Sequence, residues 1–88
     1  MAWGLLIAPA ADRTLARLPE GVAAAIVAFM LGPLCDEPRR AGKPLQRELS
    51  GFWSARRGAY RVVYRLDDDQ AMVSVVRIEH RADVYRPR

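Results

Sequence analysis

The chain has 88 residues, of which 51% are hydrophobic and 27% are charged. These totals exclude a disordered chain, and the length leaves room for one hydrophobic core, so we expect a single domain over residues 1–88. The net charge of +4 is unevenly placed, because Arg13 and Arg17 are the only two of the 14 basic residues that precede Arg39. This split favours a polyanionic partner, most simply nucleic acid, although a basic surface kept for solubility is the alternative.

The N-terminal part of the chain predicts one strand followed by a helical hairpin. The short apolar run Trp3–Pro9 fits a strand. A helix is expected next and should end at Leu18, because the residue before a proline avoids the helical conformation. A second helix is expected from Pro19 and should stop at Gly32-Pro33. Its apolar stripe has the spacing of a core-facing helix and consists of Val22, Ile26, Phe29 and Met30.

Residues 33–51 contain three prolines and two glycines and predict a long loop. Long ordered loops are disproportionately functional, and we take the loop's Lys43 and Arg47 as candidate contacts to the polyanion. The one cysteine, Cys35, cannot form a disulfide within the chain, and its acidic neighbours favour a structural thiol over a reactive one. No basic segment precedes the N-terminal apolar run, and the run is too short to cross a bilayer. We therefore expect a cytoplasmic protein that does not associate with a membrane.

The second half predicts three strands, at residues 52–57, 60–66 and 72–78, joined by turns at Gly58-Ala59 and at the acidic run 67–70. The polar tail 79–88 is expected to form a short helical turn or an arm. The element order is therefore β-α-α-β-β-β. We expect an α+β fold in which the helical hairpin packs on a small, mainly antiparallel sheet, with the first strand at its edge or in its middle.

Period-two alternation divides the middle strand into two faces. Tyr60, Val62, Tyr64 and Leu66 share the face expected to meet the helices, and Arg61, Val63 and Arg65 share the other. If Trp53 joins the helix-facing set, Arg56 falls on the same side as Arg61. The sheet is therefore expected to have one dry face and one cationic face.

Guanidinium groups suit phosphate because their planar fork donates two parallel hydrogen bonds. We take Arg56, Arg57 and Arg65 as further candidate RNA contacts. In the tail, His80 has a side chain that exchanges a proton near pH 7, and Tyr85 has a ring that stacks on unpaired bases. The alternatives are solvated arginines balanced by Asp67–Asp69, a plain surface histidine, and a tyrosine that packs the tail on the sheet. We expect no metal and no cofactor, since one histidine, one cysteine and scattered acids match no such motif.

The segments "ARLPEGVAAAI", "GKPL", "GAYRVVYRLDDD" and "EHRADVY" follow one another over nearly the whole chain. Together they resemble the RelE/ParE superfamily of bacterial toxins, and the hairpin followed by HRxxVY is most similar to the RelE-type branch. The resemblance implies a toxin of a type II toxin–antitoxin pair, with a RelE-like fold, that cleaves mRNA in the ribosomal A site. In that reaction the RNA's own 2′-hydroxyl attacks the adjacent phosphate, without a metal, and leaves a cyclic phosphate and a free 5′-hydroxyl.

The resemblance also implies roles for single residues. Arg61 matches the arginine that holds the phosphate, Arg81 the arginine that assists the leaving group, and Tyr85 the aromatic that orients the base. Arg56 matches a basic residue of the preceding strand. The lysines of the family pattern are replaced by Phe52 and Ser54, which leaves His80 as a candidate general base. The implied partners are a cognate antitoxin, the ribosome with its mRNA, and operator DNA reached through the antitoxin complex. The alternatives are a ParE-like inhibitor of DNA gyrase, and a weakly active toxin that acts mainly in an autoregulatory antitoxin complex.

Overall fold

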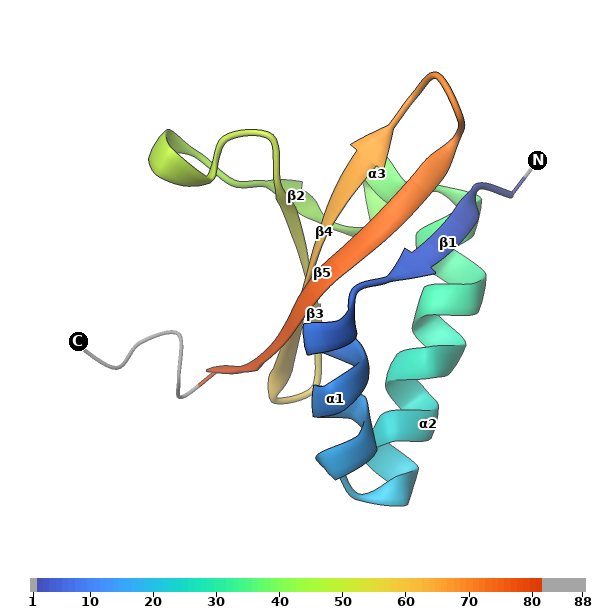
Figure 1. Ribbon diagram of the computed structural model, residues 1–88, viewed down its shortest axis with the longest axis vertical. Coiled ribbons are helices and arrows are strands. Elements are labelled where there is room, and N and C mark those ends of the chain that lie inside the picture. Colours follow the sequence, from blue (N-terminus) through green and yellow to red (C-terminus); the bar gives the residue numbers. More distant parts are fainter. Residues whose placement is uncertain (1, 82–88) are drawn as a thin grey trace.

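Helices lie on one face of a five-stranded sheet in the computed structural model, which describes residues 2–81 (Figure 1). The strands are β1 (Gly4–Ile7), β2 (Lys43–Pro44), β3 (Trp53–Arg57), β4 (Tyr60–Asp67) and β5 (Met72–His80), and the α-helices are α1 (Pro9–Arg17), α2 (Glu20–Phe29) and α3 (Pro38–Ala41). The order across the sheet is β1-β5-β4-β3-β2, with β1 parallel to β5 and the other neighbours antiparallel. The predicted α+β class, with a mainly antiparallel sheet, is confirmed, and the first strand lies at an edge. No helix among these residues is long and apolar enough to cross a membrane.

The core lies between α1, α2 and one face of the sheet. Its fully buried side chains include Ile26, Met30 and Leu34 from the helical side and Val62, Tyr64, Val73 and Val75 from the sheet. Tyr60 and Leu66 pack against this cluster, as the alternation along β4 predicts. Trp53 stacks on Tyr64 with ring centroids 6.4 Å apart, which also confirms the predicted register of β3.

The end of the second helix differs from the prediction. The chain does not stop at Gly32-Pro33; α2 ends at Phe29 and continues as a π-helical turn, Met30–Leu34, that contains Pro33. Proline has no N–H to donate, and its ring collides with the carbonyl four residues earlier. The wider π turn accommodates both effects while it keeps the two terminal side chains of the turn buried.

The segment 33–51 is also more ordered than predicted. Pro38 begins α3, a position where its missing N–H costs nothing, and Lys43 pairs with Ser54 to make β2. A 3₁₀ turn, Arg47–Leu49, follows and reaches over the sheet face that lies away from α1 and α2 (Figure 1). The predicted loop therefore contains a short helix, a strand that adds a fifth member at the edge of the sheet, and a 3₁₀ turn.

The last strand is longer than predicted and contains a β-bulge. It extends to His80 because Arg61 pairs with Glu79 across the β4–β5 ladder. The register shifts between Val63, which faces Arg77, and Tyr64, which faces Val75, so that one extra residue sits in β5. A bulge of this kind reverses the alternation of the side chains that follow it.

Tyr64 anchors α3 to the sheet from inside the core. Its hydroxyl donates a 2.6 Å hydrogen bond to the carbonyl of Pro38, and its side chain has no exposed surface. Burial raises the pKa of this phenol to about 12, because the ionised form would lose its hydration.

We expect the free energy of unfolding to fall as pH rises from 10 to 12. In the unfolded chain a tyrosine ionises near pH 10, so its stabilising contribution is complete below that value and is lost as pH approaches the folded pKa. The Tyr64→Phe variant should lack this alkaline loss, and below pH 10 it should be about 1 kcal/mol less stable because the Pro38 carbonyl loses its donor. Urea unfolding of both proteins from pH 8 to 12 measures the difference. Parallel pH curves for the two would contradict the assignment.

Candidate functional site

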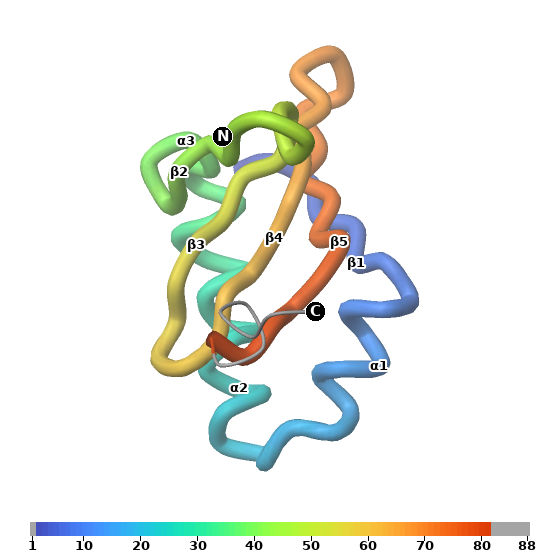
Figure 2. Tube along the Cα trace, turned by 90° about the vertical axis from the view of Figure 1, so that its left-hand side faces the viewer, coloured from blue at the N-terminus to red at the C-terminus, as the bar shows by residue number. Residues whose placement is uncertain are grey.

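Three charged side chains form a row across the sheet face that lies away from α1 and α2. Arg56 of β3 is the direct partner of Arg61 of β4, and Arg61 is the direct partner of Glu79 of β5. Directly opposed residues of antiparallel strands share a face, so the row follows from the register. Figure 2 looks onto these three strands with α2 behind them. We call this surface the cationic face, made of Lys43, Arg56, Arg61, Arg65, Arg77 and Glu79.

Glu79 is the acid of the cationic face and contacts two arginines. Its Oε1 lies 3.3 Å from Nη2 of Arg61, and its Oε2 lies 3.2 Å from Nη1 of Arg77. The glutamate side chain is 19% exposed and that of Arg61 is 30% exposed, so the pair is only partly shielded from water. Nε of Arg61 is buried and finds no hydrogen-bond partner in the described part of the chain. Leaving such a donor unpaired costs about 1–3 kcal/mol, so Arg61 is not fully satisfied by Glu79.

A small hollow adjoins this ion pair. Its volume is about 100 Å³, and its charged lining residues are Arg61, Arg77 and Glu79. The rest of its lining is apolar and consists of Leu45, Leu49, Phe52, Val63 and Val76. Phe52, which stands at one of the expected lysine positions, lies 5.7 Å below the guanidinium of Arg65. The cationic face therefore has an apolar wall supplied by the segment that contains the 3₁₀ turn.

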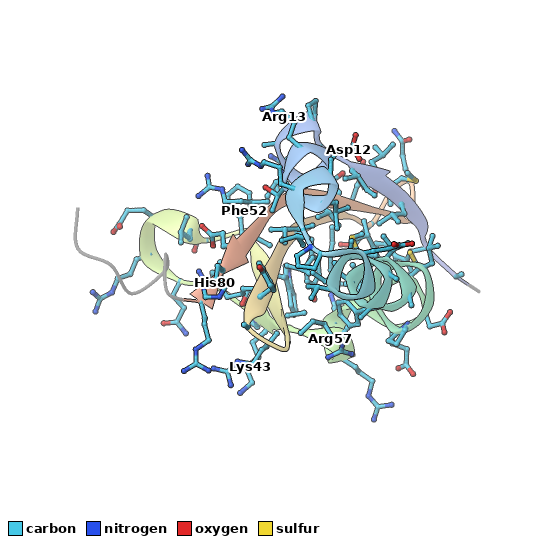
Figure 3. The ribbon with its side chains drawn as sticks, turned by 90° about the horizontal axis from the view of Figure 1, so that it is seen from below. Asp12, Arg13, Lys43, Phe52, Arg57 and His80 are labelled. Carbon is cyan, nitrogen blue, oxygen red and sulfur yellow. The ribbon has the colours of Figure 1, made fainter. Side chains whose placement is uncertain are left out.

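Arg57 lies on the other side of the sheet from Arg61. It pairs with Tyr60 at the end of the hairpin, and its guanidinium stands 3.8 Å from the centroid of the Phe29 ring. Figure 3 shows it on the side where α2 lies. Arg57 also lines an apolar groove with Val22 and Ile26 of α2. Of the predicted RNA contacts, the structure gathers Lys43, Arg56 and Arg65 around Arg61 and separates Arg57 from them.

The candidate residues near the C-terminus also lie in different places relative to Arg61. His80 pairs with Tyr60 and meets its ring edge-on at 5.1 Å between centroids, on the helix side of the sheet. The backbone N–H of Arg81 donates to the carbonyl of Ala59 at 2.7 Å, which holds Arg81 at the same end of the sheet as Arg61. Tyr85 lies outside the described residues. Arg47 is exposed in the 3₁₀ turn beside the hollow, with a positive φ of 60°.

Other polar groups have structural roles. Arg39 donates two hydrogen bonds to Asp68, at 2.8 and 2.9 Å, and lies between the rings of Trp3 and Trp53. The hydrogen bonds to Asp68 raise the pKa of this guanidinium. Burial raises the pKa of the Cys35 thiol, which donates to the Met30 carbonyl, as expected for a structural cysteine. Within residues 2–81 no three His, Cys, Asp or Glu side chains are grouped closely enough to hold a metal ion.

Arg77 and Glu79 lie on the cationic face although the sequence pattern did not indicate either of them for it. Counting alternate positions from Val73 and Val75 directs Arg77 toward the helices, and only the bulge turns it to the cationic face. A signal was available in the sequence, because the polar residues Ser74 and Arg77 are three positions apart inside an otherwise alternating strand.

The fold and this face define a small basic α+β protein with a surface suited to phosphate. A family model described as the ParE toxin of the type II toxin–antitoxin system parDE matches residues 5–85. The toxin RelG of Mycobacterium tuberculosis is 54% identical over 76 residues, which are 86% of this chain and 87% of that protein. The toxin RelE of the same organism is 51% identical over 80 residues, or 91% and 82% of the two chains.

Solved structures agree with these relatives. A chain of the toxin–antitoxin complex RelBE2 from M. tuberculosis superposes with a TM-score of 0.88 and 46% identity, and the match covers 92% of this chain and all of that one. A mutant of the E. coli toxin RelE, solved in the free state, shares the fold with a TM-score of 0.75 at 22% identity over 97% of this chain and 88% of that one. The chain therefore belongs to the RelE/ParE superfamily, as a RelE-type toxin of a type II toxin–antitoxin system.

Proposed function

We propose that this toxin is a ribosome-dependent endoribonuclease that cleaves mRNA in the A site. The observation that supports this most is the row of Arg56, Arg61 and Glu79 with Arg77 beside it, because it concentrates guanidinium groups from three adjacent strands on one face. An RNA phosphodiester needs such donors when charge builds up on its oxygens in the transition state. The reaction uses the RNA's own 2′-hydroxyl as the nucleophile and needs no metal ion.

In this proposal Arg61 holds the scissile phosphate and stabilises the charge on its oxygens. Arg81, at the same end of the sheet, assists the departing 5′-oxygen, and Tyr85 stacks on the base. Lys43, Arg47, Arg56 and Arg65 bind flanking phosphates. Arg57, which packs on Phe29, is left out of this set. His80 packs against Tyr60 on the helix side of the sheet. We therefore propose that a water molecule, and not His80, accepts the proton of the 2′-hydroxyl.

A cognate antitoxin is the second proposed partner. The RelBE2 chain that resembles this protein was solved in a toxin–antitoxin complex, and so was an E. coli chain of the same fold in the intact RelBE complex. An acidic segment that folds on binding would suit the cationic face, and such a complex could also bring the toxin to operator DNA. We place the toxin in the cytoplasm, where its target ribosomes translate.

Inhibition of DNA gyrase is the second candidate function, because the matching family model is described as a ParE toxin. A third candidate is a weakly active toxin that serves mainly in an antitoxin complex. It is suggested by Phe52 and Ser54, which stand where the family pattern has lysines.

Brief induction of the toxin without antitoxin, followed by primer extension on abundant mRNAs, separates these functions. We expect cuts at ribosomal A sites, and we expect translation to stop in a purified system that contains ribosomes. Intact mRNA together with a DNA damage response would favour gyrase as the target. Intact mRNA with undisturbed translation and replication would leave the antitoxin complex as the toxin's main role.

A further inference from the structure

The carboxylate of Glu79 presents two oxygens to two different arginines. One oxygen meets Nη2 of Arg61 and the other meets Nη1 of Arg77. A phosphodiester also shares one negative charge between two free oxygens, and guanidinium N–H groups bind both anions in the same way. We propose that Glu79 occupies the place of an RNA phosphate in the free toxin, and that RNA displaces it. Arg77 then joins Arg61 in holding that phosphate. This inference rests on the proposed RNA-cleaving function.

The contacts of Glu79 are of a kind that another anion can replace. Each arginine gives one contact, at 3.3 and 3.2 Å, whereas charged N–H···O hydrogen bonds are typically about 2.7–2.9 Å long. Nε of Arg61 remains without a partner among the described residues, so Glu79 uses only the Nη2 half of the side-on fork of this guanidinium. A phosphate that takes the place of Glu79, with the Arg61 side chain turned so that its buried Nε faces it, would accept from both Nε and Nη2 and satisfy more donors than Glu79 does.

A second ion pair in the same protein, between Arg39 and Asp68, has the close geometry of a structural ion pair. Arg39 donates to both oxygens of Asp68, at 2.8 and 2.9 Å, and is flanked by the rings of Trp3 and Trp53. This pair joins α3 to the turn between β4 and β5. Glu79 is held less closely although it is the more buried carboxylate, with 19% of its side chain exposed against 63% for Asp68. Close pairing is therefore used where the fold needs it and is absent at the cationic face.

The surroundings of Glu79 favour RNA over a free inorganic anion. The hollow beside it continues from the two arginines onto the apolar wall that contains Leu49 and Phe52. A nucleotide has an apolar ring face next to its phosphate, and bases of single strands stack on aromatic side chains. The hollow is too small to enclose a nucleotide, but its lining brings charged and apolar groups together where a phosphate and the edge of a base could both make contact.

The test compares the affinities of purified toxin variants for a short single-stranded RNA whose riboses are 2′-O-methylated, so that it cannot be cleaved. Glu79→Gln should bind this RNA about fivefold more tightly than the wild type in low salt, because the competing carboxylate is gone. Glu37→Gln is the matched control, since it makes the same charge change and also deprives an arginine, Arg40, of its glutamate. We expect this control to change the affinity by less than about twofold. Melting curves confirm that both variants are folded.

Arg77→Gln provides the second comparison. It should weaken RNA binding in the wild-type background and remove the gain in the Glu79→Gln background. Equal affinities of Glu79→Gln and Glu37→Gln, weaker binding by Glu79→Gln, or no binding by either would overturn the inference. Because this assay contains no ribosome, its outcome is separate from that of the primer-extension experiment. If Glu79→Gln binds RNA more tightly but the wild type makes no A-site cuts, the proposed nuclease activity is rejected. The displacement of Glu79 by RNA is then still supported.

Discussion

Arg61→Ala is expected to lower the rate of A-site cleavage at least about a hundredfold, the usual effect of removing one donor from a transition-state anion. The residue lies in the centre of the sheet, with Arg56 and Glu79 as its direct neighbours, so its guanidinium lies in the middle of the cationic face. Glu79 keeps its contact with Arg77 in this variant, which limits the damage to the fold. Single-turnover cleavage on programmed ribosomes measures the effect, and growth after induction reports it in cells.

Arg40→Ala is the matched control for this prediction. Arg40 also pairs with a glutamate, at 3.4 Å, but it lies in α3 and its partner Glu37 precedes that helix. The control should arrest growth as the wild type does. The Arg61→Lys variant should fall between the two, because lysine retains the charge without the planar fork. Undiminished growth arrest by an Arg61→Ala, Arg81→Ala double variant would count decisively against the proposed nuclease.

Gly42→Ala is expected to lower the free energy of unfolding by about 1–3 kcal/mol, the usual cost of an overpacked site. A Cβ atom at this position would stand 2.5 Å from the Ser54 carbonyl oxygen and 2.5 Å from the Tyr64 hydroxyl oxygen. The backbone of Gly42 is extended, with φ of −146°, so the cost comes from this crowding and not from strain in the residue itself. For a domain of this size the melting temperature should fall by about 4–8 °C for each kcal/mol.

Gly21→Ala serves as the control for this stability prediction. Gly21 lies in the first turn of α2, and a Cβ atom there would meet nothing within 4 Å. Since alanine favours the helix, this variant should melt at or above the wild-type temperature, with a gain of up to about 1 kcal/mol. A Gly42→Ala protein as stable as the wild type would show that β2 moves away from Tyr64 at little cost.

Residues whose environment follows from local periodicity could be predicted from the sequence. Alternation along β4 gave the correct faces for Val62, Tyr64 and Arg61, because this central strand runs without interruption. The same rule failed in β5, where the extra residue at the bulge is fixed by pairing with two different neighbours, β1 and β4. No short window of sequence contains that information.

Residues whose environment depends on contacts with distant segments could not be predicted from the sequence. Pro33 was expected to end a helix, and it instead sits in a π turn whose Met30 and Leu34 are held by the core. The position of Arg57 against Phe29, away from Arg61, is also set by a contact with another element, which its basic character does not indicate. In each case a tertiary contact decided between conformations or partners that the local sequence allows equally.

The bulge at Val76 also divides β5 into two halves with different neighbours. Up to Val75 its partners are β1 and the acidic-turn end of β4, and beyond the bulge it pairs with the half of β4 that carries Arg61. The second half still reaches the interior through Ile78, so a hybrid chain joined at Val76 keeps its core packing only if the incoming segment keeps an apolar side chain at that position. With that one side chain kept, the charged residues of the second half can change while β1 and the first half of β5 keep their pairing.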